Sequence, residues 1–319
     1  MATVTTSTTT KPTTGEPGSP SGGSPPGPSD ARVSDENGPR ARFKASVRHF
    51  IRSQPLGLAA FAFIVLLILL AVFADLVTSF DPTIQNRRDV KVGPNGTFFF
   101  GTDHLGRDVF ARIIYGSRIS LTVAGSVVVL STFIGVVIGG VSGYFGGWVD
   151  LVLQRIIDAV MSIPVLVLAL FIVALLGPSL RNLVLALVVV YTPRFTRIAR
   201  GEMLRIKESD YVAAAEALGA RPFRTIARHG VPNLMAPIII MASLSFGNAI
   251  VAEAALSFLG LGVPPPNPSW GRMVADAKEW IRLFPWMLLA PATAISLSVL
   301  AFNLFGDAVR DHLDPKLVR

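Results

Sequence analysis

The amino-acid sequence predicts an all-α integral membrane protein, a bundle of six membrane-spanning helices with a disordered N-terminal tail. Of the 319 residues, 51% are hydrophobic and only 16% are charged, whereas ordinary soluble domains carry roughly 25% charged residues. Several uncharged runs reach the length of about 20 apolar residues that a helix needs to cross the hydrocarbon core of a bilayer. These observations argue against a soluble globular domain.

The N-terminal tail differs in composition from the rest of the chain. Residues 1–39 are rich in Thr, Ser, Pro and Gly and hold almost no aliphatic side chains. Such a segment cannot bury enough apolar surface to offset the entropy that is lost on ordering. We therefore expect a disordered tail over residues 1–39, followed by a transmembrane domain over residues 45–319.

Uncharged runs define the spans. The fourth is the shortest, because it is bounded by Arg181 and Arg194, but the charged end of Arg181 can reach the membrane interface while its stem stays in the hydrocarbon. The expected spans are about 56–78, 119–143, 159–178, 182–200, 233–257 and 285–306.

The positions of Lys and Arg predict the orientation. They collect before the first span, in the loop 201–232 and after the last span, and basic residues favour the cytoplasmic side of a membrane. Both termini and the loop 201–232 should therefore be cytoplasmic, with the loops 79–118 and 258–284 outside. The net charge of +8 is accounted for in the same way, so we expect no nucleic acid partner.

Patterns that would indicate catalysis or metal binding are missing from the sequence. The chain has no cysteine, its four histidines lie in separate segments, and no lysine follows a glycine, as a phosphate-binding loop requires. We therefore expect no catalytic residue, no metal site and no cofactor on this chain. If it moves a solute uphill, the energy comes from an ion gradient or from another subunit.

Glycines recur at every fourth position of the second expected span, at Gly135, Gly139, Gly143 and Gly147. Such a ridge lets a second helix approach backbone to backbone. Helix packing is one interpretation, and a pore-lining or hinge role is the other.

Two polar residues of the fifth span are candidates to line a translocation path, namely Asn248 and Glu253. A carboxylate within a membrane must be protonated, paired or in contact with water, because burying its charge is costly. The alternative for Glu253 is a structural hydrogen bond within the bundle.

The external loops carry a second set of candidates. Turn-forming glycines precede an amphipathic stretch after Val109, and a proline cluster precedes Trp270. Docking of an external partner and anchoring at the membrane interface are both compatible with these patterns. The docking candidates are Asp103, Gly106, Arg107, Asp108 and Trp270.

The most unusual stretch is the water-facing segment 211–233, which lies between two long apolar runs. Ser209 or Asp210 can cap a first, alanine-rich helix, and Gly219 can end it. Pro222 suits the first turn of a second, basic helix, and Pro232 ends that helix before the fifth span. This hairpin is typical of a plug for a groove in a partner protein; the alternative is a hairpin that binds anionic lipid.

This segment resembles the cytoplasmic EAA loop of ABC importer permeases, with Gly219 at the family glycine. Where the family usually has the Glu of Glu-Ala-Ala, this chain has Ala213, and Glu216 follows one turn later. From about residue 45 to the C-terminus, the chain is similar to the C-type permease subunit of dipeptide, oligopeptide and nickel importers. The motifs that carry this resemblance are GTDHLGRDVFARIIYGSRISL, YVAAAEALGA, EAALSFLGLGVPPPNPSWGRM and AFNLFGDAVRDHLDPKL.

The resemblance implies a type I importer fold in the bacterial cytoplasmic (inner) membrane. It also implies the partners: a homologous B-type permease, two ATP-binding subunits that hold ATP and Mg, and an extracytoplasmic peptide-binding protein, besides membrane lipid. Peptides would be the cargo, with nickel, glutathione or another small solute as alternatives, and an ion-coupled secondary transporter as the competing class. The residues that would contact an ATP-binding subunit are Tyr211, Ala213, Ala214, Ala215, Glu216, Gly219, Arg221, Phe223 and Pro232.

Overall fold

The computed structural model describes residues 54–313, which belong to one compact unit. The expected tail 1–39, and residues 45–53 and 314–319 of the expected domain, lie outside the described residues. The described residues form helices, and one isolated bridge pairs Thr102 with Asp108, so the all-α prediction is confirmed. The helices are α2 (Pro55–Val72), α3 (Ala74–Val77), α4 (Val109–Phe145), α5 (Gly147–Met161), α6 (Val165–Leu176), α7 (Leu180–Lys207), α8 (Asp210–Ala217), α9 (Pro222–Thr225), α10 (Val231–Phe258), α11 (Trp270–Ala277) and α12 (Trp286–Leu313), with short turns η1 (Arg87–Asp89), η2 (Ile226–Gly230) and η3 (Lys278–Trp280).

Within residues 54–313, five helices are long and apolar enough to cross a membrane, and a sixth span results if the bent pair α5 and α6 is counted as one. The expected third span, about 159–178, is therefore not a single straight helix. It breaks between Met161 and Val165, and the two helices meet at 90°. Pro164 explains the break, because proline lacks the backbone N–H that would continue the helix.

The helix α4 begins ten residues earlier than the span expected at 119 and runs without interruption to Phe145. The Asp108 carboxylate caps it by accepting a hydrogen bond from the Ala111 N–H. Arg112 and Arg118 do not stop the helix, because both find partners on neighbouring segments. Arg112 donates to the carbonyl of Pro82, and Arg118 forms an ion pair with Asp75.

The most extensive helix contact in the described unit joins α4 to α7. Three glycines of α4 allow it, because a Cβ at Gly135 would lie 2.4 Å from the Phe195 Cβ, and one at Gly143 would lie 2.8 Å from the Arg200 carbonyl oxygen. Gly139 meets the same helix equally closely. The packing interpretation is confirmed for these three positions, whereas Gly147 faces open space at the start of α5.

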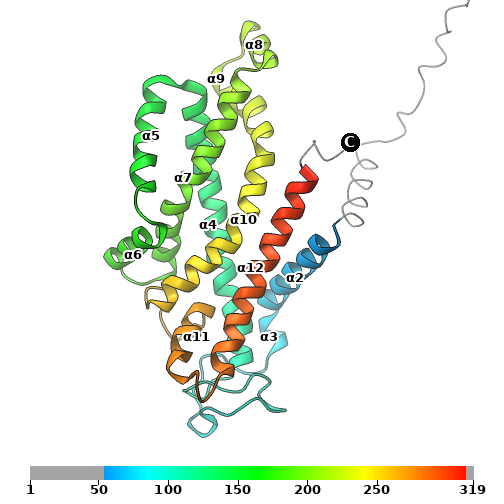
Figure 1. Cartoon of the computed structure of the whole chain (residues 1–319), viewed down its shortest axis with the longest axis vertical. Helices are drawn as coiled ribbons and strands as arrows, with labels where there is room; N and C mark the ends of the chain where they lie inside the picture. Colours follow the sequence, from blue (N-terminus) through cyan, green and yellow to red (C-terminus); the bar gives the residue numbers. More distant parts are fainter. Residues whose placement is uncertain (1–53, 314–319) are drawn as a thin grey trace, which may run out of the picture. The chain divides into compact units, whose positions relative to one another are not determined.

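The two ends of the described unit carry different elements. Figure 1 shows α8 and α9 at one end, which we call the α8 end, and α11, α3 and the loop that precedes α4 at the other, which we call the α11 end. Between them, large apolar side chains such as Phe61, Phe133 and Phe171 remain exposed. Apolar side chains exposed along spanning helices suit contact with lipid or with another membrane subunit.

Candidate functional site

The hairpin at the α8 end is formed by α8 and α9. Gly219 ends α8 with a backbone φ of +85°, a conformation that glycine adopts without a steric penalty. The Ala220 N–H donates to the Ala215 carbonyl, which closes the turn. Pro222 then occupies the first turn of α9, where its missing N–H costs nothing. A Cβ at Gly219 would meet no atom within 4 Å, so only backbone strain opposes a side chain there.

The tip of the hairpin exposes large apolar side chains. Leu218 is 90% exposed and Phe223 is 74% exposed. Tyr211 is also exposed. Exposed apolar groups clustered on a water-facing loop are typical of a surface that another protein covers. The remaining predicted contact residues lie around them: Ala213, Ala214, Arg221 and Pro232 are exposed and Ala215 is half-buried, whereas the Glu216 side chain lies outside the described part of the structure.

The base of the hairpin is anchored to the helices beneath it. Val212 is buried in an apolar cluster that also contains Tyr144 of α4, Met203 of α7 and Leu234 of α10. The Phe223 ring contacts the ring of Phe145 at the end of α4. The base of the hairpin therefore belongs to an apolar cluster that contains residues of three long helices.

Polar contacts between α4, α5 and α7 lie next to this apolar cluster. Arg200 of α7 forms two hydrogen bonds with the Asp150 carboxylate of α5, at 2.5 and 2.6 Å. The same carboxylate accepts a hydrogen bond from Ser142 of α4, and Lys207 donates to the carbonyl of Tyr144. The end of α4 is thus tied to α5 and α7 directly below the hairpin.

The Glu253 carboxyl group lies where α10 packs against α4. Its side chain is fully buried and accepts hydrogen bonds from Ser120 of α4 at 2.9 Å and from Ser257 at 2.7 Å. A carboxyl group held in this way joins α4 to α10. The geometry therefore favours the structural alternative for Glu253 over a position in a translocation path.

Asn248, the other candidate for a translocation path, is exposed and lines a cavity of about 210 Å³ between α6, α7 and α10. The cavity also contains Arg194, which the sequence analysis used only as the boundary of an uncharged run. The expected span 182–200 already ran through Arg194, and the structure agrees, because Pro193 does not end α7, which continues to Lys207.

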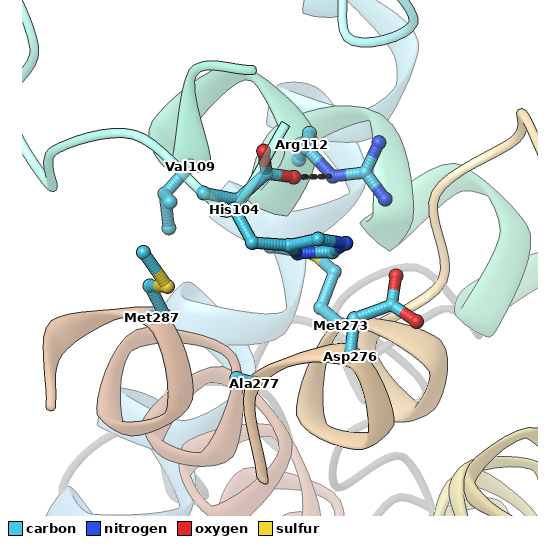
Figure 2. A pocket seen from close by; sticks show the side chains of 8 residues that line it. His104, Val109, Arg112, Met273, Asp276, Ala277 and Met287 are labelled. Carbon is cyan, nitrogen blue, oxygen red and sulfur yellow. Dashed lines mark ion pairs between the residues drawn. The ribbon is translucent and has the colours of Figure 1, made fainter. Parts of the chain in front are cut away.

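At the α11 end, the predicted docking residues are buried. The Asp103 carboxylate forms an ion pair with Arg107 at 2.6 Å and lies 3.6 Å from the Arg112 guanidinium. Arg107 also faces Asp276 of α11 at 3.7 Å. Side chains of α4, α11 and α12 converge there around His104 (Figure 2). The charges are compensated within the protein, so they fix the loop to α11.

The three other predicted docking residues stabilise the same end. Trp270 is fully buried, and its indole N–H donates to the Ile113 carbonyl at 3.0 Å. Gly106 has a φ of +75°, and a Cβ there would lie 1.9 Å from the Asn86 carbonyl oxygen, so no other residue fits. Burial raises the pKa of the Asp108 carboxyl group above its ordinary value. The hydrogen bond from the Ala111 N–H favours the charged form and opposes this effect, but it is the smaller of the two.

Comparison with known proteins decides the family. A family model described as the inner membrane component of binding-protein-dependent transport systems matches residues 135–319. The chain belongs to this family. A second model, the N-terminal transmembrane domain of oligopeptide transport permease C, matches residues 43–94 of this permease.

Curated relatives of the permease agree with the family models. It is 42% identical to the dipeptide transport system permease protein DppC of Alkalihalophilus pseudofirmus, over 84% of this chain and 88% of the relative. It is 38% identical to the oligopeptide transport system permease protein OppC of Bacillus subtilis, over 83% and 87%. It is also 38% identical to the glutathione transport system permease protein GsiD of Pectobacterium atrosepticum, over 89% and 95%. The resemblance to the C-type permease subunit of ABC importers is confirmed, and the chain is a multi-pass membrane protein.

Proposed function

We propose that this permease forms one half of the translocation path of an ATP-driven importer of di- or oligopeptides in the cytoplasmic membrane. A homologous B-type permease supplies the other half. Two ATP-binding subunits hold ATP and Mg, and one of them binds the hairpin formed by α8 and α9. An extracytoplasmic binding protein delivers the peptide to the α11 end.

One observation carries this proposal, namely the contrast between the tip and the base of the hairpin. Leu218 is 90% exposed at the tip, whereas Val212 is buried at the base. A hairpin that only bound anionic lipid would need its basic residues and exposed apolar side chains, but not a base packed against the bundle. A hairpin that transmits the motion of an ATP-binding subunit needs both features.

The distribution of charge supports the proposed orientation. The α8 end carries basic residues in α7 and along the hairpin, including Arg205, Lys207, Arg221, Arg224 and Arg228, as cytoplasmic segments do. The α11 end then faces outward. There the buried residues Asp103, Gly106, Arg107, Asp108 and Trp270 would hold the shape of the surface on which the binding protein docks.

The relatives support a peptide as the cargo. Those named above transport a dipeptide, an oligopeptide or glutathione by their names, and glutathione is itself a peptide derivative. Glutathione is the second candidate, favoured by the relative that aligns over 95% of its length. An ion-coupled secondary transporter would need an acidic group accessible within the membrane to bind the coupling ion, whereas the Glu253 carboxyl group is hydrogen-bonded and buried.

A matched pair of substitutions tests the role of the hairpin. A Cβ at Gly219 or at Gly201 would meet no atom within 4 Å, but only Gly219 has a positive φ. Gly219→Val therefore strains the turn, whereas Gly201→Val improves the helix propensity of α7. We expect Gly219→Val to abolish ATP-driven peptide uptake while its level in the membrane stays unchanged, and Gly201→Val to retain uptake. Normal uptake by Gly219→Val would contradict the proposal.

A further inference from the structure

Three arginines follow one another at every third position of α7, and they differ in their partners. Arg197 forms an ion pair with Asp158 at 2.6 Å, and Arg200 forms one with Asp150 at 2.5 Å. Both carboxylates belong to α5. Arg194 is exposed and forms no ion pair within residues 54–313. Its charge is therefore available to a group outside residues 54–313.

The position of Arg194 along α7 makes an unpaired charge unusual. It lies 13 residues after Arg181 on one helix, which corresponds to about 20 Å at a rise of ~1.5 Å per residue. Because the hydrocarbon core is about 30 Å thick, Arg194 lies within the membrane if Arg181 marks one face. An unpaired charge at this depth is costly unless it faces water or a ligand, and such residues mark ion and substrate pathways.

The cavity around Arg194 has the composition of a site for a small ligand. Its volume is about 210 Å³, and none of its lining residues is acidic. Tyr191 and Asn248 add a phenol and an amide to the guanidinium, and the remaining lining residues are apolar. A mostly apolar wall with a few polar groups is typical of ligand pockets. The polar groups of this cavity include the charged guanidinium and the amide N–H₂, which are hydrogen-bond donors.

We propose that this cavity binds the carboxylate of the transported peptide. The guanidinium of Arg194 matches a carboxylate with two parallel hydrogen bonds, and the amide of Asn248 can donate a third. The apolar residues Val165, Leu166 and Val251 would contact the adjacent side chain. The inference rests on peptide transport as the proposed function and names the part of the peptide that the permease recognises.

The absence of cysteine from the chain allows a direct test in the assembled transporter. Val251→Cys on α10 and, independently, Leu166→Cys on α6 each place one thiol on the cavity wall. The transporter is reconstituted in phosphatidylcholine vesicles and labelled with an anionic and a cationic methanethiosulfonate of equal size. The assembly that carries the cysteine-free chain gives the background rate.

The positive charge should set the relative rates of the two reagents. We expect Arg194→Gln to lower the ratio of anionic to cationic labelling by about tenfold, the effect of one unit charge a few ångströms away in a partly aqueous site. Arg194→Lys should preserve the ratio, because it keeps the charge. An unchanged ratio in Arg194→Gln for both thiols would overturn the proposal, and so would thiols that react with neither reagent once the partner subunits are present.

Protection by ligand identifies the chemical group. We expect dialanine to slow the labelling, dialanine amide to have no effect, and Arg194→Gln to remove the protection. Equal protection by both compounds, protection by neither, or protection by phosphatidylglycerol alone would overturn the carboxylate site. ATP-driven dialanine uptake is measured in the same vesicles. Uptake without protection would leave the proposed function standing, whereas the absence of ATP-driven uptake of any peptide would contradict that function itself.

Discussion

At the α11 end of the permease, charged and aromatic side chains are buried, whereas at the α8 end large apolar side chains are exposed. Arg107 and Trp270 are almost inaccessible at the first end, and Leu218 is 90% exposed at the second. A buried ion pair fixes a loop, because removing one partner leaves an uncompensated charge. Apolar side chains exposed on a water-facing loop are typical of a surface that another protein covers. The charges at the α11 end are thus compensated within this chain, whereas the proposed function assigns a partner to the apolar tip at the α8 end.

Substitution of Trp270 should have the largest effect on the stability of the folded permease. Trp270→Ala removes a fully buried indole and its hydrogen bond to Ile113, which costs about 3–5 kcal/mol, a large share of a typical folding free energy of about 5–15 kcal/mol. We expect the amount of permease in the membrane to fall severely, as measured by immunoblot of washed membranes. Trp148→Ala is the control, because that indole is 81% exposed. Equal levels of the two variants would contradict the description of the α11 end.

Leu218 should affect assembly without affecting folding. Leu218→Asp places a charge on the apolar tip and should weaken binding of an ATP-binding subunit by about 2 kcal/mol or more, as hot-spot residues do. We expect this subunit to be lost on copurification while the permease level stays normal. Leu283→Asp makes the same change at an exposed position, since Leu283 is 71% exposed, and should retain the subunit. Loss of the subunit from both variants would remove the distinction between the two ends.

Substitution of Asp108 should have the smallest effect on the stability of the folded permease, and this effect should depend on pH. Asp108→Ala removes the cap of α4 and should cost about 1 kcal/mol, whereas Asp108→Asn keeps a cap acceptor. Because burial raises the pKa of Asp108, the folded state binds its proton more tightly, so the folded wild type gains stability as the pH falls through that raised value.

Thermal unfolding of the purified transporter measures this effect. Asp108→Asn should be at least as stable as the wild type at neutral pH, because the buried charge is gone, and this advantage should shrink on acidification. An advantage that grows on acidification would show that the Asp108 carboxylate is stabilised by its surroundings.

Much of this architecture could be predicted from the sequence, because length and hydropathy are sufficient to find spanning helices. The hairpin was also predictable, since Gly219 and Pro222 have strong local preferences. Local patterns did not show where a helix breaks or where it continues. The bend before α6 depends on Pro164, which the hydropathy of its surroundings conceals. Arg112 was expected in an amphipathic stretch outside the membrane, and the structure shows that this stretch is the first part of α4, where Arg112 donates to the Pro82 carbonyl and lies 3.6 Å from Asp103.

The lack of a carboxylate partner for Arg194 among residues 54–313 could not be predicted either. Arg194 served only as the boundary of an uncharged run within the expected span 182–200, since a sequence does not show whether an arginine has a partner. Only the structure separates it from Arg197 and Arg200, which carboxylates of α5 neutralise. Glu253 was identified for its charge, yet its hydrogen bonds to Ser120 and Ser257 come from positions whose proximity required the folded bundle.

The glycine contact between α4 and α7 has a mechanical consequence. Where the backbone of Gly139 meets the Thr196 carbonyl, no flexible side chain separates the two helices, so neither can slide along the other without a collision of main-chain atoms. We therefore expect α4 and α7 to behave as a single stiff rod, with the hairpin at one end and Arg194 along its length. A tilt imposed at the hairpin would then move α7 relative to α10 and change the width of the cavity that contains Arg194.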